Sequence, residues 1–180
     1  MIRTYARIFF ITGPLFFLGM LFSNLAIMEA RPALENALTL GLLFGTAVSA
    51  IMGTLHIVRA RHAAAGETGR DIYALRQVRE FESALDYERL FTTVTHYLEK
   101  TAGFTLTEKD QEAGRIAARS PFNFNTFGSG ITVRLEKKPG APTLVRIISK
   151  PLVFTVMADY GENLKNAKDL EAHLRGSEHR

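Results

Sequence analysis

The sequence has no cysteine among its 180 residues. This absence excludes a disulfide framework, a cysteine-ligated metal and a cysteine nucleophile, and it fits a reducing compartment. Apolar residues make up 47% of the chain, the usual share for a globular protein. They are unevenly placed, because residues 1–60 hold nearly all of the long apolar runs.

The sequence also lacks a strongly basic soluble segment. Residues 1–70 carry six Arg against three Glu, a charge of +3, and residues 71–180 carry 16 Lys and Arg against 15 Asp and Glu, a charge of +1. A nucleic-acid-binding module usually has a dense basic face. We therefore expect no nucleic-acid partner.

Recognisable catalytic and metal-binding patterns are missing as well. No histidine forms a convincing metal-ligand set on one predicted face; the five are His56, His62, His96, His173 and His179. His96 and Glu99 are three apart on a predicted helix, which is typical of a surface polar pair. The segment Gly128-Ser129-Gly130 lacks the Gly-Lys-Ser/Thr ending of a phosphate loop. Neither Ser120 nor Ser129 lies in a G-x-S-x-G context. The sequence therefore predicts no catalytic residue, no metal site and no cofactor.

Two runs lack charged residues and predict membrane spans, Ile8–Met28 and Ala37–Val58. As a helix, the 21 residues of the first run would be about 31 Å long, the thickness of the hydrocarbon core of a bilayer. The polar segment EARPALEN, Glu29–Asn36, predicts a turn between two antiparallel helices. A cleaved signal peptide is the alternative for the first run, but the run is long and a second follows at once.

Arginines flank the two runs on one side. Arg3 and Arg7 precede the first run, whereas the turn has Arg31 against two glutamates. The arginines that follow the second run are Arg59, Arg61, Arg70, Arg76 and Arg79. The positive-inside rule places both termini and the soluble domain in the cytoplasm, at a cell membrane that we expect to be a bacterial inner membrane. Arg3, Arg7, Arg59 and Arg61 are the residues expected to contact lipid headgroups.

Small residues recur at every fourth position of the second run: Gly41, Gly45, Ser49 and Gly53. Such a ladder lets another helix approach closely. Two partners are consistent with the pattern. The first run of the same chain offers Gly13, Gly19 and Ser23, and the other partner is a helix of another subunit, which would make an oligomer or a complex.

The remaining chain predicts a linker at residues 61–71, an α+β domain at 72–176 and a tail at 177–180. Asp86 is a helix N-cap, Gly103 a helix stop, and Asn163 the cap of a last helix. Alternating segments predict strands at residues 77–85, 104–110, 114–120, 131–138 and 143–150, with 152–159 also extended. For residues 77–85, whose alternation is partial, a helix is the alternative. The expected fold is an antiparallel sheet of four to six strands with two helices on one face, in the order strand, helix, four or five strands, helix, as in helix-grip or TATA-binding-protein-like layers.

The stretch SPFNFNTFGSG, residues 120–130, alternates phenylalanine with asparagine. One interpretation is a half-buried strand that continues residues 114–120 past Pro121 and turns at the glycines. The other is an exposed tip that faces a membrane or a partner. Under the second interpretation, the candidate contacts of a partner or ligand are Phe122, Phe124, Phe127, Asp159 and Tyr160.

These features favour a non-enzymatic, membrane-anchored cytoplasmic interaction module, such as an accessory subunit of a larger membrane complex. Its expected partners are membrane lipids and another membrane or cytoplasmic protein. The alternative is a domain that senses a lipid or small ligand in a cavity between helices and sheet. A membrane-associated enzyme is a third hypothesis, but no convergent set of polar residues supports it.

Overall fold

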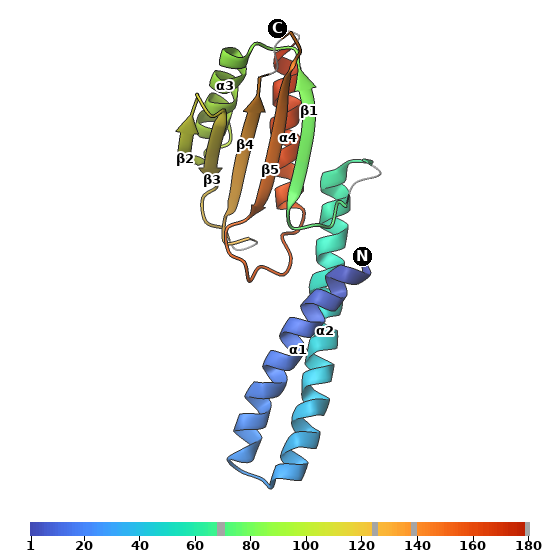
Figure 1. Ribbon diagram of the computed structural model, residues 1–180. Coiled ribbons are helices and arrows are strands. Elements are labelled where there is room, and N and C mark those ends of the chain that lie inside the picture. Colours follow the sequence, from blue (N-terminus) through green and yellow to red (C-terminus); the bar gives the residue numbers. More distant parts are fainter. Residues whose placement is uncertain (68–70, 124–125, 138–139, 179–180) are drawn as a thin grey trace. The chain divides into compact units, whose positions relative to one another are not determined.

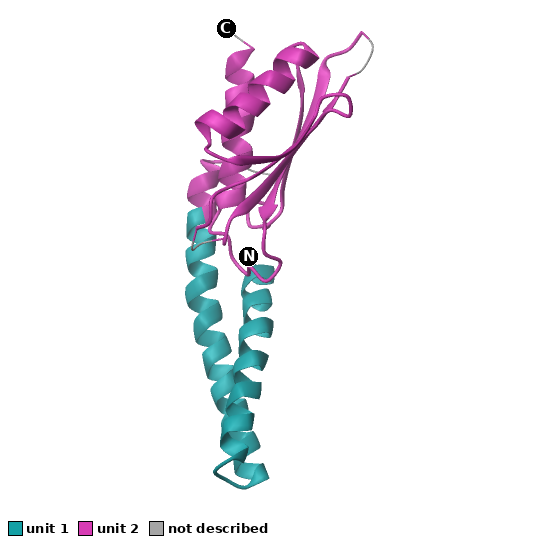
Figure 2. Cartoon of the chain, turned by 90° about the vertical axis from the view of Figure 1, so that its left-hand side faces the viewer, with its two compact units in different colours: residues 1–59 teal, residues 60–180 magenta. Residues whose placement is uncertain are grey.

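The computed structural model of the chain describes residues 1–67, 71–123, 126–137 and 140–178. It divides into two compact units, Met1–Arg59 and Ala60–Arg180, which Figure 2 shows in different colours. The division falls inside a helix, whereas the sequence suggested a linker at residues 61–71. Residues 61–64 are helical and belong to the second unit.

Unit 1 consists of the helix α1, Ile2–Leu25, and most of the helix α2, Ala30–Ala64. By length and composition, both helices are long and apolar enough to cross a membrane. The connection between them is shorter than the predicted segment 29–36, because α2 already begins at Ala30. Proline is tolerated in the first turn of a helix, which accommodates Pro32, and Arg31 pairs with Glu35 one turn later at 3.1 Å.

Many large apolar side chains of these two helices are exposed. Phe10, Leu15 and Phe22 of α1 are 70%, 70% and 73% exposed, and Leu43 and Ile51 of α2 are each 63% exposed. In a water-soluble helix, such side chains would face a core. The two helices therefore present an apolar outer surface along most of their length.

Unit 2 contains one five-stranded antiparallel sheet in the order β1-β5-β4-β3-β2. The strands are β1 Gln77–Ser83, β2 Thr105–Asp110, β3 Arg115–Arg119, β4 Ser129–Glu136 and β5 Thr143–Pro151. The helix α3, Tyr87–His96, continues into a π-helical turn η1, Tyr97–Thr101, and the helix α4, Glu162–Ser177, ends the domain. Figure 1 shows both helices on one face of the sheet. This confirms the predicted α+β layers and is consistent with a helix-grip arrangement.

The alternation in the sequence decides which face of the sheet is buried. Ile131, Val133 and Leu135 of β4 are 1%, 0% and 4% exposed, as predicted from their period of two. The apolar stripe of α4 packs on the same side, with Leu170 and Leu174 completely buried. Asp86 caps α3, because its Oδ1 accepts a hydrogen bond from the Arg89 N–H at 2.9 Å.

Two predicted extended segments are not strands. β5 ends at Pro151, and residues 152–159 form an irregular loop instead of an extended strand. Likewise, β3 ends at Arg119 and residues 121–123 are irregular, so the chain does not run on past Pro121. Proline has no N–H to donate to a sheet, and both strands end at or just before one. Phe124 lies outside the described residues.

Candidate functional site

The ladder of small residues on α2 lies against α1 within unit 1. A Cβ added to Gly45 would be 2.8 Å from the Gly13 Cα, and one added to Gly53 would be 2.5 Å from the Tyr5 ring. The Ser49 hydroxyl donates a hydrogen bond to the Tyr5 carbonyl at 2.7 Å. The backbones of the two helices therefore approach at positions where larger side chains would clash.

The arginines predicted to contact headgroups occupy different surroundings. Arg3 and Arg59 are exposed and Arg7 is half-buried. The Arg61 Nε donates a hydrogen bond to the Tyr73 hydroxyl at 2.9 Å. Arg61 thus also fastens the end of α2 to the segment that leads into β1.

Asp159 and Tyr160 build the start of α4. Asp159 is 1% exposed, and its carboxylate accepts hydrogen bonds from the backbone N–H groups of Gly161 and Asn163, each at 3.2 Å. Tyr160 and Gly161 have φ angles of 52° and 81°, the left-handed conformation that reverses the chain before the helix. Asp159 therefore performs the capping role predicted for Asn163, whose own side chain bonds Ser149 and Asp159.

Glu162, the first residue of α4, holds the loop that follows β3. Its Oε1 accepts a hydrogen bond from the Asn123 amide at 2.8 Å and one from the Ser129 hydroxyl at 3.2 Å. The Thr126 hydroxyl lies 3.2 Å from the same oxygen. Thr126 and Ser129 are completely buried, so this carboxylate anchors the loop from within the fold.

Among the described residues, the loop after β3 and the loop after β5 together carry five exposed apolar side chains, here named the apolar tip. Its members, with their exposed fractions, are Phe122 64%, Phe127 49%, Leu152 42%, Val153 37% and Phe154 97%. The loops lie side by side, because the Leu152 N–H donates to the Gly128 carbonyl at 3.0 Å. The ring centroids of Phe122 and Phe127 are 5.7 Å apart. Phe122 and Phe127 are therefore surface residues, and neither belongs to the core.

The sheet face opposite α3 and α4 has no described element of unit 2 on it, as Figure 2 shows. Strand register places Arg115, Arg134 and Arg146 in one row across β3, β4 and β5. Glu108 pairs with Arg115 at 2.9 Å and Glu80 with Arg146 at 3.6 Å. Arg134, in the middle, has no ion-pair partner among the described residues. The same register places Asp110 of β2 opposite Arg115 and Glu80 of β1 opposite Arg146, so an acidic residue flanks the row at each end. Like charges directly opposite in a sheet are unfavourable, and Arg134 is the residue with an arginine on both sides.

A buried ion cluster joins the end of α2 to the sheet within unit 2. The side chain of Arg79 is 6% exposed, and its guanidinium binds Glu67 at 2.5 Å and Glu171 at 2.8 Å. The hydrogen bond from Arg79 lowers the pKa of Glu67, although partial burial opposes this shift. Burial acts to lower the pKa of Arg79, but its bonds to the two glutamates outweigh that and raise the pKa. Arg79 was grouped with the membrane-flanking arginines from the sequence, and the structure corrects this, because Arg79 is an interior residue of β1.

The end of α2 is capped by a residue far along the chain. The Lys168 ammonium donates to the carbonyls of Ala63 and Ala64 at 2.9 and 2.7 Å and lies 3.5 Å from Glu67. The last carbonyls of a helix have no partner inside the helix, and a cation there also complements the helix dipole. Residues 60–67 are therefore a fixed part of unit 2.

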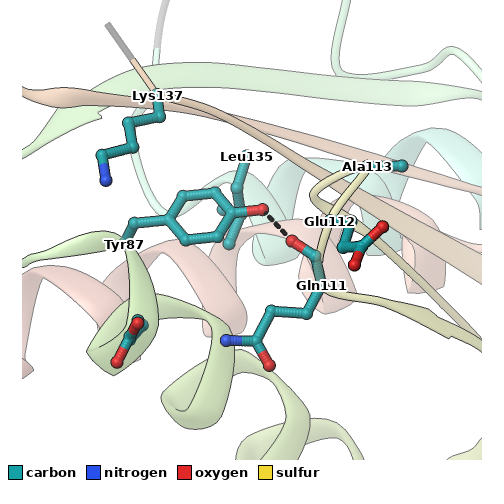
Figure 3. Close-up of a pocket in the computed structure, with 7 residues that line it drawn as sticks. Tyr87, Gln111, Glu112, Ala113, Leu135 and Lys137 are labelled. Carbon is teal, nitrogen blue, oxygen red and sulfur yellow. Dashed lines mark hydrogen bonds between the residues drawn. The ribbon is translucent and has the colours of Figure 1, made fainter. Parts of the chain in front are cut away.

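Unit 2 has surface hollows at the end of the sheet farthest from the apolar tip. One, of about 730 Å³, is lined by Tyr87, Gln111, Glu112 and Lys137, among others. In Figure 3 the Tyr87 hydroxyl points at the Gln111 carbonyl, to which it donates at 2.5 Å. Burial raises the pKa of Tyr87, and the negative charge of Asp110 adds to the shift. This tyrosine is engaged in holding the turn, and the described residues contain no metal-binding group of three or more histidines or carboxylates.

A hollow of about 200 Å³ lies where η1 meets α4, lined by Tyr97, Phe104, Lys165, Asn166 and Asp169, among others. Pockets that enclose drug-sized ligands are usually about 300–1,000 Å³. The side chains between helices and sheet form one packed cluster that includes Leu90, Leu98, Ile116 and Ile147 at 0% exposure. This packing gives little support to the ligand-cavity hypothesis.

Sequence reasoning identified Phe122 and Phe127 but missed Phe154, the arginine row and the buried Arg79. The arginine row is invisible in the sequence because it depends on strand register, which joins residues far apart in the chain. Phe154 was assigned to an extended strand. Its position three residues after Pro151 was the available signal that the strand had ended.

The chain is thus an apolar helical hairpin joined to an antiparallel α+β domain. No protein-family model matches it, and no curated protein matches it. One solved structure that resembles it is described as "Crystal structure of Ara h 8.0201"; the identity is 8%, the match covers 57% of this chain and 96% of that chain, and the TM-score is 0.35. Similarity at this level carries no inference about function.

Proposed function

We propose that this protein is a non-enzymatic interaction module anchored in a cell membrane by the hairpin of α1 and α2, with unit 2 in the cytoplasm. The observation that carries the proposal is the apolar outer surface of two helices of 24 and 35 residues, only 17% and 22% buried in their most apolar windows. A bilayer accommodates such a surface, because its lipid tails contact the apolar side chains that no protein core covers.

Orientation follows from charge. Arg3, Arg7, Arg59 and Arg61 lie at the termini of the hairpin, whereas the turn end has one arginine, Arg31, against Glu29 and Glu35. The positive-inside rule then favours a cytoplasmic unit 2 in a bacterial inner membrane. The absence of cysteine agrees with that compartment.

The open sheet face supports an interaction role. Its arginine row would be balanced by carboxylates of a partner, so we propose an acidic protein surface as the occupant. Each of Arg115 and Arg146 already has one glutamate, which leaves Arg134 as the arginine most available to a partner. A complex with a protein of this kind fits an accessory subunit.

The test is charge reversal in native membranes. We expect the protein, extracted with a mild detergent and run on native electrophoresis, to migrate as a complex larger than the monomer. Arg134→Glu should shift most of it to the monomer. The matched control is Arg89→Glu, which makes the same charge change at an exposed position on α3, on the other side of the sheet. A wild-type protein that migrates only as a monomer would contradict the proposal.

A further inference from the structure

We infer that the apolar tip is a lipid-binding site, which inserts into the interfacial layer of the bilayer that holds the hairpin. The tip consists of Phe122, Phe127, Leu152, Val153 and Phe154, as defined above. The inference rests on the proposed insertion of α1 and α2 in a membrane. It adds a second membrane contact, made by the α+β domain itself.

The first argument is the exposure of the tip. Phe154 is 97% exposed and Phe122 is 64% exposed, on two loops joined by the hydrogen bond from Leu152 to Gly128. Contiguous exposed apolar groups mark protein or membrane contacts. Glu162 binds Asn123 and Ser129 on either side of the tip residues of the first loop, and the second loop is joined to the first through Leu152.

The second argument is chain connectivity. Ala60 belongs to unit 2 and follows the apolar run of α2, which ends at Val58, by two residues, about 3 Å along a helix axis. Within unit 2, Gly161 touches Ala60 so closely that an added Cβ would lie 2.8 Å from the Ala60 Cα. The neighbouring Glu162 binds the loop of the tip through Asn123. The tip and Ala60, the first residue of unit 2, therefore lie at the same end of the domain.

The third argument is charge. Strand register aligns Arg119 of β3, Gly130 of β4 and Lys150 of β5 in one row, which directly precedes the two loops of the tip. Both basic side chains are exposed and have no ion-pair partner among the described residues. Cations that border an inserted apolar group suit anionic headgroups. This favours a bilayer over an apolar protein surface as the occupant.

The sequence has no tryptophan, so a single introduced tryptophan reports on one site. The full chain is reconstituted in phosphatidylcholine–phosphatidylglycerol vesicles that contain doxyl-labelled phosphatidylcholine as a quencher. Phe154→Trp and, separately, Phe122→Trp should lose emission to the quencher and shift to shorter wavelength. Ala141→Trp, exposed in the turn between β4 and β5 at the opposite end of the sheet, is the control that should keep its emission.

A tryptophan in α1, Leu18→Trp, separates this inference from the proposed function. Quenching of Leu18→Trp without quenching of Phe154→Trp and Phe122→Trp would overturn the tip inference and leave the anchored hairpin intact. A blue shift of Phe154→Trp without quenching would mean that protein covers the tip, which also overturns it. If Leu18→Trp is not quenched, the hairpin is not in the bilayer and both proposals fail.

The role of Arg119 and Lys150, the two cations beside the apolar tip, is tested separately. Arg119→Glu combined with Lys150→Glu should reduce quenching of Phe154→Trp in vesicles with phosphatidylglycerol, and should do so less in vesicles of phosphatidylcholine alone. Equal quenching of the charge-reversed and unaltered proteins in the anionic vesicles would overturn the role given to the two cations.

Discussion

At the scale of single residues, Arg79 and Glu67 show how unit 2 holds the end of α2. The side chain of Arg79 is buried, and the carboxylates of Glu67 and Glu171 neutralise its charge. A buried charge without a partner is costly, so the arrangement depends on both carboxylates being ionised. Because the folded-state pKa of Glu67 is lowered, Glu67 contributes stability above its unfolded pKa of about 4.3 and loses that contribution as pH falls through its folded pKa.

We therefore expect Glu67→Gln to destabilise unit 2 by about 1.5–3 kcal/mol at pH 7, the size of a hydrogen bond to a charged group. The difference from wild type should shrink toward zero at pH 3, where Glu67 is protonated in the unfolded chain and increasingly in the folded one. Urea unfolding of the full chain in detergent micelles at both pH values measures this. Glu82→Gln, at an exposed position of β1, is the control. An undiminished difference at pH 3 would count against the ion-pair explanation.

At the scale of elements, the helical hairpin depends on small residues at the crossing of α1 and α2. Gly45→Leu would push a side chain into the Gly13 backbone, where even a Cβ would come within 2.8 Å. Overpacking of this kind costs about 1–3 kcal/mol. The heat-induced aggregation midpoint in detergent should therefore fall for Gly45→Leu. It should hardly change for Gly19→Leu, because a Cβ at Gly19 meets nothing within 4 Å. Equal effects of both substitutions would contradict this packing.

The elements that the sequence predicted well are those with a strict local period or cap. Asp86, the alternation of Ile131 and Val133, and the apolar stripe of α4 are local signals, and the structure has them as expected. The prediction that residues 152–159 form an extended strand was wrong, because a short apolar run has no period that distinguishes a strand from an exposed loop. The start of α2 was predicted too late, because a polar, proline-containing segment is typical of a turn. The first turn of a helix also tolerates both features.

The candidate sites also include some that local sequence patterns predict and some that they do not. The small-residue ladder of α2 and the exposed Phe122 and Phe127 could be singled out from sequence spacing alone. The arginine row and the anchoring of the tip by Glu162 could not, because each joins residues from strands and loops far apart in the chain. Burial of Arg79 was hidden for the same reason, since its two carboxylate partners lie 12 residues before it and 92 residues after it.

At the scale of the whole molecule, we propose a hairpin in the bilayer and an α+β domain that meets two surfaces. In this proposal the apolar tip contacts lipid, and the open sheet face with its arginine row binds an acidic protein. Both proposed roles require that the two helices cross the membrane, and a cytoplasmic partner also requires that unit 2 lies on the cytoplasmic side. Topology is therefore the central claim.

Single-cysteine labelling tests this topology most directly, because the chain has no cysteine of its own. Glu29→Cys lies in the turn between α1 and α2, and Ala141→Cys is exposed in unit 2. In intact bacterial cells with a permeable outer membrane, a membrane-impermeant maleimide should label Glu29→Cys and leave Ala141→Cys unlabelled until the inner membrane is disrupted. Labelling of Ala141→Cys in intact cells, or protection of Glu29→Cys, would contradict the account.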